Sequence, residues 1–238
     1  MDRLIHTALS GMRASMDSQR VIASNMANAN TLGFRAEMLD QRAVTIEGQP
    51  NEARAMQTAR VRGANMAAGE IVQTGRDLDI AMATDALMAV QATDGTEAYT
   101  RRGDLSVSAT GLLVNGEGLP VLGDTGPITI PPTGFPAIAP DGTPDQPPAE
   151  IGRIKLAAWQ GSPISKGLDG LFRVEGGGIL PTDEAATVTV GAVEGSNVKT
   201  TEVLVEMIDA QRLFAMRSKV IATAREIDES GAQLMRLG

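Results

Sequence analysis

The stretch Ser-Asn-Met-Ala-Asn-Ala-Asn-Thr-Leu-Gly-Phe-Arg, residues 24–35, ends a long helix-forming segment. Residues 1–30 contain no proline and a single glycine, Gly11. Asparagine is unfavourable inside a helix because its side chain competes for backbone hydrogen bonds, and Gly33 can adopt the left-handed conformation that terminates helices. We therefore predict a helix that begins near the N-terminus and ends between Asn28 and Gly33.

Upstream of this stretch, small and apolar residues recur at alternating intervals of three and four, the repeat that keeps one side of a helix against a partner. The repeat consists of Ile5, Ala8, Met12, Ser15, Gln19, Ile22, Met26 and Ala29, widened by Leu9, Met16 and Ala23. Because most helical stability comes from packing an apolar face, this helix requires a partner.

The C-terminal segment, residues 198–238, has the same character: it lacks proline, and its only glycines are Gly231 and Gly238. Its repeat consists of Leu204, Met207, Gln211, Phe214, Ser218 and Ile221, and then shifts to Ala224, Ile227, Gly231 and Leu234. Ser196 or Asn197 is expected to cap its start. The two ends of the chain are thus predicted to be long helices that pack in a coiled-coil-like bundle.

The middle of the chain is rich in turn signals and in short runs of alternating polarity, which are typical of β-strands. All 12 prolines lie between the two helical segments, nine of them from Pro120 to Pro148. We expect an α+β fold with three parts. These are a helical domain of residues 1–35 and 197–238, an extended connector of residues 36–75, and a β-rich domain of residues 76–196 with an exposed proline-rich loop at 120–148.

Composition excludes several classes of function. The net charge of −8 and the aromatic content of 3% oppose phosphate-backbone binding and base stacking, so we expect no nucleic-acid partner. The chain has no cysteine, which excludes disulfides and thiolate chemistry. No stretch approaches the roughly 20 apolar residues of a membrane span, and no cleavable signal peptide is evident at the N-terminus, so we expect no membrane insertion.

Candidate chemical sites are weak. His6 is the only histidine, and no second imidazole or thiolate exists to complete a metal site. The carboxylates of Asp77, Asp79 and Asp85 lack the spacing of a calcium loop. The run Gly176-Gly177-Gly178 is followed by no lysine and is expected to form a turn rather than to bind phosphate. We expect no catalytic residue, no metal and no cofactor.

Residues 24–35 resemble the N-terminal signature of bacterial flagellar rod and hook proteins, approximately S-N-N-[IL]-A-N-x-[NS]-T-x-G-[FY]-[KR], with Met26 in place of the second asparagine. Residues 8–12 resemble the family's entry motif. Residues 194–198, 205–208 and 211–212 are similar to its C-terminal signature, and the resemblance extends into the middle of the chain through residues 78–81 and 99–103. Residues 152–156 and 169–173 are similar to the proximal-rod member, although residues 84–88 lack the family's usual glycine and aromatic.

The resemblance implies a structural subunit of the flagellar basal-body rod, with no enzymatic activity. Its partners would be further copies of itself, the adjacent rod proteins and the type III export apparatus, which would export it without a cleaved signal. Its place would be the rod that spans the periplasm. A distal-rod subunit is the alternative, and a secreted β-domain enzyme with oligomerising helices is a more distant one.

The residues expected to form the assembly interface lie on the two helical repeats and in the asparagine cluster, where buried amides between helices can fix register. They are Ile5, Met12, Ile22, Asn25, Met26, Asn28, Asn30, Asn197, Leu204, Met207, Gln211, Phe214 and Ile221.

Overall fold

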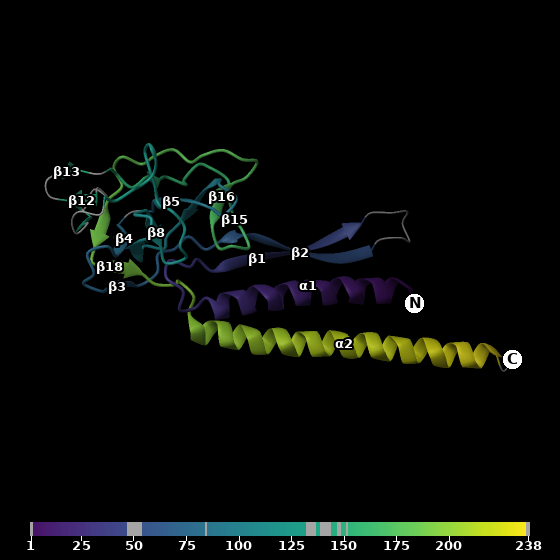
Figure 1. Cartoon of the computed structure of the whole chain (residues 1–238). Coiled ribbons are helices and arrows are strands. Elements are labelled where there is room, and N and C mark those ends of the chain that lie inside the picture. Colours follow the sequence, from purple (N-terminus) through teal and green to yellow (C-terminus); the bar gives the residue numbers. More distant parts are fainter. Residues whose placement is uncertain are drawn as a thin grey trace. The chain divides into compact units, whose positions relative to one another are not determined.

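A computed structural model describes residues 2–46, 54–83, 85–131, 137–138, 144–146, 149–150 and 152–236 (Figure 1). The chain divides into two compact units. The helical unit comprises residues 1–27, 37–62 and 199–238, and the β unit comprises residues 28–36 and 63–198. Helices and antiparallel strands are therefore largely segregated, which confirms the α+β class.

The helical unit consists of two helices and one pair of strands: α1 (Asp2–Ala27), α2 (Thr200–Arg236), β1 (Glu37–Ile46) and β2 (Arg54–Ala64). Helices α1 and α2 lie side by side, α1 also packs on β1, and β1 pairs with β2 (Figure 1). The segment predicted as an extended connector, residues 36–75, contains the strands β1 and β2.

The buried row of α2 recurs at intervals of four and three, as expected for a helix packed along a partner. It consists of Val203, Met207, Ala210, Phe214, Arg217, Ile221 and Ala224, each buried or half-buried. Four residues of the predicted repeat belong to it, Met207, Phe214, Ile221 and Ala224, whereas Leu204, Gln211 and Ser218 are exposed. In place of these three, the row that α2 buries within the chain contains the residue that precedes each of them: Val203, Ala210 and Arg217.

The face that α1 buries is made mostly of small residues, which let another helix approach closely: Ser10, Gly11, Ala14, Ser15, Val21 and Asn25. The guanidinium of Arg217 in α2 donates hydrogen bonds to the carbonyl of Gly11 and the hydroxyl of Ser15. A Cβ at Gly11 would stand 3.6 Å from this guanidinium, an ordinary van der Waals contact, so the close packing here does not require glycine.

The β unit consists of antiparallel pairs around one sheet of five strands, ordered β14-β5-β6-β16-β15. These strands are β5 (Leu87–Gln91), β6 (Glu97–Thr100), β14 (Leu156–Ala157), β15 (Ile164–Lys166) and β16 (Phe172–Val174). The other pairs are β3 (Ile71–Gln73) with β18 (Ala192–Glu194), β4 (Ile80–Met82) with β17 (Val188–Val190), β7 (Leu105–Val107) with β8 (Leu113–Asn115), and β9 (Leu122–Gly123) with β10 (Gly126–Pro127). Three short strands, β11 (Ala137–Ile138), β12 (Pro144–Gln146) and β13 (Ala149–Glu150), form a further small sheet.

The five-stranded sheet is covered on both faces. Along β5, Met88 and Val90 belong to one hydrophobic cluster, whereas Leu87 and Ala89 belong to another. Since successive side chains of a strand point to opposite faces, the strand reads as a continuous apolar run. Tyr99 of β6, in the second cluster, donates to the carboxylate of Glu97 at 2.8 Å.

The segment predicted as an exposed proline-rich loop is only partly a loop. Val121, Ile128 and Ile130 are buried in the main hydrophobic cluster, so the first part of residues 120–148 is a component of the β unit. The prediction of an exposed loop was wrong for this first part, because it relied on the prolines and not on the apolar residues between them. Residues 132–136, 139–143 and 147–148 lie outside the described residues.

Candidate assembly interface

The chain leaves α1 through a tight turn, as residues 24–35 predict. The hydroxyl of Thr31 donates to the side-chain carbonyl of Asn28 at 3.1 Å, and the amide of Thr31 donates to the Asn28 backbone carbonyl at 3.1 Å. Gly33 has a φ of +67°, and a Cβ there would overlap the backbone between Arg101 and Arg102. Only glycine fits this position, because L side chains rarely adopt that conformation and no space exists.

Directly after the turn, the side chain of Arg35 enters a buried cluster centred on Glu194. The guanidinium of Arg35 lies 2.6 Å from one carboxylate oxygen of Glu194. Arg101 meets the other oxygen with two of its nitrogens, at 2.5 Å and 2.7 Å. The amide of Gly69 donates to the Glu194 carboxylate at 2.7 Å, and the amide of Gly33 donates to its backbone carbonyl at 2.7 Å. We call Arg35, Arg101 and Glu194 the carboxylate clamp.

The clamp joins three segments that are far apart in the sequence and that the signatures contain: residues 33–35, 99–103 and 194–197. Its side chains are almost wholly buried, with exposures of 2% for Arg35 and 1% for Glu194. Burial lowers the pKa of the Arg101 guanidinium, and the facing carboxylate of Glu194 offsets part of that effect. Removing a partner from such a pair leaves an uncompensated buried charge, which is strongly destabilising.

Asn197 forms a second junction between the same ends of the β unit. Its side-chain carbonyl accepts from the amide of Ala36 at 2.8 Å. Its side-chain amide donates to the carbonyls of Asn65 and Ala67 at 2.7 Å and 2.8 Å. The predicted helix cap at residue 196 or 197 is therefore wrong: α2 begins at Thr200, and the Asn197 side chain is engaged in these three bonds.

A third contact lies next to these two. The ammonium of Lys166 stands 3.3 Å from the centre of the Phe34 ring and donates to the carbonyl of Arg35 at 2.8 Å. A cation over an aromatic face is attracted by the ring quadrupole, and more so when partly desolvated. Residues 33–36 and 194–197 are thus joined by the Arg35–Glu194 ion pair and by the bond from the Ala36 amide to Asn197, while Lys166 packs against Phe34.

Asn25 performs a comparable role inside the helical unit. Its amide donates to the carbonyl of Glu37 at 3.0 Å, and its carbonyl accepts from the Glu37 amide at 2.7 Å. The hydroxyl of Ser24 donates to the Glu37 carboxylate at 3.1 Å. A buried amide that satisfies both backbone groups of one residue fixes where β1 starts against α1.

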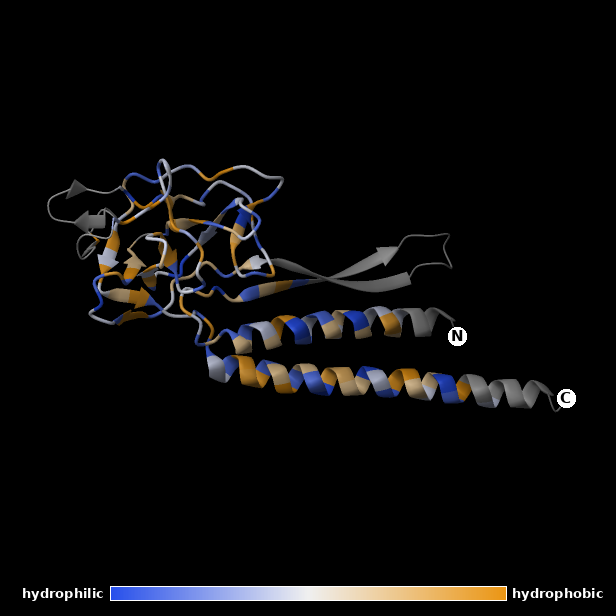
Figure 2. Cartoon of the chain, in the orientation of Figure 1, coloured by the Kyte–Doolittle hydropathy of each residue, from blue (hydrophilic) through white to orange (hydrophobic). Residues whose placement is uncertain are grey.

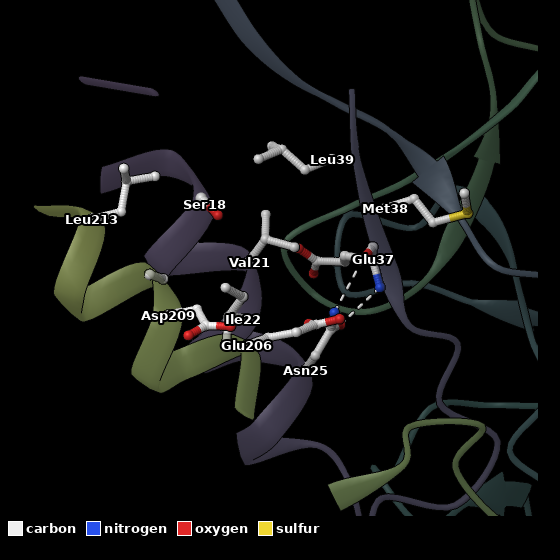
Figure 3. A pocket seen from close by; sticks show the side chains of 11 residues that line it. Ser18, Val21, Ile22, Asn25, Glu37, Met38, Leu39, Glu206, Asp209 and Leu213 are labelled. Atoms are coloured by element: carbon white, nitrogen blue, oxygen red, sulfur yellow. Dashed lines mark hydrogen bonds between the residues drawn. The ribbon is translucent and has the colours of Figure 1, made fainter. Parts of the chain in front are cut away.

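A groove of about 520 Å³ lies between α1, α2 and β1 (Figure 3). Its apolar lining includes Val21 and Ile22 of α1 and Leu213 of α2 (Figure 3). Its carboxylates are Glu37 of β1 and Glu206 and Asp209 of α2; among the described residues, no lysine, arginine or histidine lines it.

Helix α2 exposes more apolar side chains than is usual for a helix whose apolar face packs entirely within its own chain. Hydrophobic residues continue around and along α2 between the polar ones (Figure 2). The exposed large ones are Leu204, Val205, Ile208, Leu213, Met216, Val220 and Ile227. Monomeric proteins rarely leave extended apolar surface uncovered, and such surface marks an interaction site.

The structure distributes the predicted interface residues over three environments. Asn25 is buried and Asn197 half-buried, each in a hydrogen-bonded junction; Asn28 is half-buried in the turn, and Asn30 is exposed. Half-buried in the helical unit are Met12, Ile22, Met26, Met207, Phe214 and Ile221, whereas Leu204 and Gln211 are exposed. The side chain of Ile5, in α1, lies outside the described residues. Whether these residues contact other copies stays a prediction.

Sequence reasoning did not identify the clamp or Glu37. Arg35, Arg101 and Glu194 all belong to the quoted signatures. Their opposite charges were the only indication in the sequence that they pair. Among the described residues, no group of three histidine, cysteine or carboxylate side chains is placed to hold a metal ion. In the same part of the chain, no helix is both long and apolar enough to cross a membrane.

Three family descriptions match the chain in order. They are a flagella basal body rod protein region at residues 5–35, a flagellar hook protein FlgE/F/G D1 domain at 81–143, and a flagellar basal body rod FlgEFG protein C-terminal region at 189–234. The flagellar basal-body rod protein FlgF of Salmonella typhimurium is 40% identical, with 100% of each chain covered. FlgF of Escherichia coli is 38% identical over 100% of each chain. FlgG of Agrobacterium fabrum is 31% identical, over 94% of this chain and 96% of its own.

Proposed function

We propose a position within the flagellar rod for this chain, which belongs to the flagellar basal-body rod protein family that includes FlgE, FlgF and FlgG. It is a structural subunit of the flagellar rod rather than an enzyme. Within the rod we place it in the proximal, FlgF-type position. This choice rests on sequence identity. Over the full length, the chain is 40% identical to one FlgF, whereas it is 31% identical to two FlgG relatives.

The subunit would polymerise through its terminal helices in a coiled-coil-like bundle with neighbouring copies and with adjacent rod proteins. The exposed apolar side chains of α2 support this proposal, since their burial between copies would be favourable by roughly 25 cal/mol per Å². The interface residues would include Ile22, Leu204 and Phe214. The assembling domain would comprise residues 1–35 and 197–238, joined through the connector at 36–75 to an outer β-rich domain of residues 76–196.

The carboxylate clamp and Asn197 have a clear place in this scheme. They tie residues 33–36, which follow α1, to residues 194–197, which precede α2. Both chain ends of the β unit are thereby fixed to each other, a suitable base for two helices that must meet neighbours in register. A rigid base reduces the entropy lost when copies join.

Family membership also supports export through the flagellar type III apparatus without a cleaved signal, followed by residence in the periplasmic rod. We propose that the terminal helices complete their order on joining the rod, where several neighbours bind at once. The ordering entropy would then be offset at incorporation.

Complementation separates the two rod positions. The chain would be produced in Salmonella typhimurium strains that lack either FlgF or FlgG, with motility and rod length as readouts. We expect swimming to return in the strain without FlgF and not in the strain without FlgG. Rescue of the FlgG strain alone would assign the chain to the distal rod instead.

A further inference from the structure

We propose that the groove between α1, α2 and β1 receives α2 of a second copy of this chain. The surface that enters it is the basic face of α2, defined as Arg212, Met216, Lys219 and Val220. This inference rests on the proposed function, because it assigns the surfaces by which neighbouring rod subunits join.

The groove is complementary to an occupant that is apolar and carries positive charge. Its lining combines the apolar residues Val21, Ile22 and Leu213 with the carboxylates of Glu37, Glu206 and Asp209. Glu206 and Asp209 are exposed and form no ion pair with another described residue. Leu213, in the same lining, is 41% exposed. An occupant that covers Leu213 while placing cations beside the two carboxylates would satisfy both features.

The basic face offers the complementary chemistry. Residues 212–225 of α2 contain four basic side chains and no acidic one. Arg217 is engaged within the helical unit, where it donates to Gly11 and Ser15. Arg212 and Lys219 are exposed and form no ion pair among the described residues. Between them along the helix, Met216 is 60% exposed and therefore available for burial.

The charged residues of the two surfaces lie on different sides of α2. At 3.6 residues per turn, Arg212 and Lys219 point roughly a third of a turn away from Glu206 and Leu213, whereas Met216 and Val220 lie beside Asp209 and Leu213. One copy can therefore receive a neighbour with its groove while Arg212 and Lys219 face a second neighbour. Such a heterologous contact repeats without closing and builds a helical assembly rather than a symmetric dimer.

Cysteine cross-linking tests this pairing directly, because the chain has no cysteine of its own. Two differently tagged full-length copies, one with Asp209→Cys and one with Met216→Cys, would be produced together in the native host. Basal bodies would then be isolated and oxidised. We expect a disulfide-linked species that carries both tags. Copies with Asp209→Cys alone should give at least 10-fold less of it, since like surfaces do not meet.

The outcomes separate the contact from the function. Basal bodies that contain both copies without the mixed species would overturn the groove contact and leave the rod role intact. A product between the Asp209→Cys copy and a different rod protein would replace the second copy as occupant. If the wild-type chain itself is absent from basal bodies, both the proposed function and the contact are wrong.

A charge exchange provides an independent measurement. E206K/D209K and R212E/K219E should each reduce incorporation into basal bodies at least 10-fold, because each places like charges across the contact. Produced together, the two variants should restore it, since the reversed groove of one accepts the reversed face of the other. The control D124K/E175K changes two exposed carboxylates of the β unit and should incorporate normally. Failure of the mixture to recover would contradict the pairing.

Discussion

The carboxylate of Glu194 lies 2.6 Å from the guanidinium of Arg35, and both side chains are almost completely buried. The two residues belong to the two end signatures of the chain, so one ion pair joins the segment after α1 to the segment before α2. Arg101 shares the same carboxylate, which gives the cluster two cations for one anion. The Nε and Nη1 atoms of Arg35 have no hydrogen-bond partner among the described residues.

This imbalance predicts an order of mutational costs. Glu194→Gln removes the carboxylate that two buried guanidiniums share and should lower the free energy of unfolding by ~3–5 kcal/mol. Arg35→Met should cost less, since the Glu194–Arg101 pair survives. Urea unfolding of both variants measures the difference. Arg173→Ala, which breaks a more exposed pair with Asp169, is the matched control and should cost under ~1 kcal/mol. An equal cost for Glu194→Gln and Arg173→Ala would refute the role of the clamp.

Gly33 tests the close approach of the first turn to the segment around Arg101. Gly33→Ala should destabilise the β unit by more than ~1–3 kcal/mol, because strain at positive φ adds to overlap with the backbone. Gly118→Ala is the control: its φ of +79° is similar, but no atom lies within 4 Å of its added Cβ. In thermal unfolding, the midpoint temperature of Gly33→Ala should be well below that of Gly118→Ala. The reverse order would show that the overlap at Gly33 is relieved at little cost.

Asn25 predicts a change confined to the helical unit. Asn25→Asp keeps the acceptor for the Glu37 amide but loses the donor to its carbonyl and adds a charge beside it, at a cost of ~1–3 kcal/mol. Hydrogen exchange at the amide of Glu37 should accelerate, while exchange in β5 and β6 stays unchanged. Asn30→Asp, at an exposed position, should alter neither. Unchanged protection of Glu37 in Asn25→Asp would show that the Asn25 side chain does not fix the start of β1.

Tyr99 predicts a pH dependence at the alkaline end. Burial raises the pKa of its hydroxyl, the hydrogen bond to Glu97 raises it further, and the amide of Leu180 offsets part of this. Because the folded pKa exceeds the unfolded value of roughly 10, the stabilisation is present below that pH and is lost as pH rises through the folded value. The chain has one tyrosine, so tyrosinate absorbance follows this group alone. Titration at the ordinary pKa in folded protein would contradict the burial.

The two helical repeats predict the effect of charge on assembly. Ile22→Asp and Phe214→Asp should abolish rod formation and motility, because Ile22 lines the groove and Phe214 belongs to the row that α2 buries, so each change places a carboxylate in apolar surroundings. The β unit should remain folded, as judged by the protease resistance of residues 76–196. Leu168→Asp, at a fully exposed position of the β unit, is the control. Normal swimming of both helix variants would show that the repeats do not form the contact.

The helices were predictable because their signals are local. The seven-residue repeats and the absence of proline predict α1 and α2. The asparagine stretch with Gly33 predicts an end between Asn28 and Gly33, directly after the observed end of α1 at Ala27. The row that α2 buries was not fully predictable, since choosing between Leu204 and Val203 depends on the small residues of α1. No pattern within α2 carries that information.

The clamp could not be derived because its members contact one another only through the fold. Glu194, Arg35 and Arg101 are isolated charges in three distant segments, and charged residues are ordinarily expected at the surface. Asn197 illustrates the same limit. Its type suits a helix cap, yet tertiary contacts with Ala36, Asn65 and Ala67 determine its role.

The most direct test of the rod assignment is to identify the proteins in purified basal bodies of the native host and of a strain that lacks this chain. Mass spectrometry should find the chain in wild-type rods. The deletion strain should be non-motile, with basal bodies that stop before the distal rod. Motile deletion cells with complete rods, or wild-type rods without the chain, would contradict it.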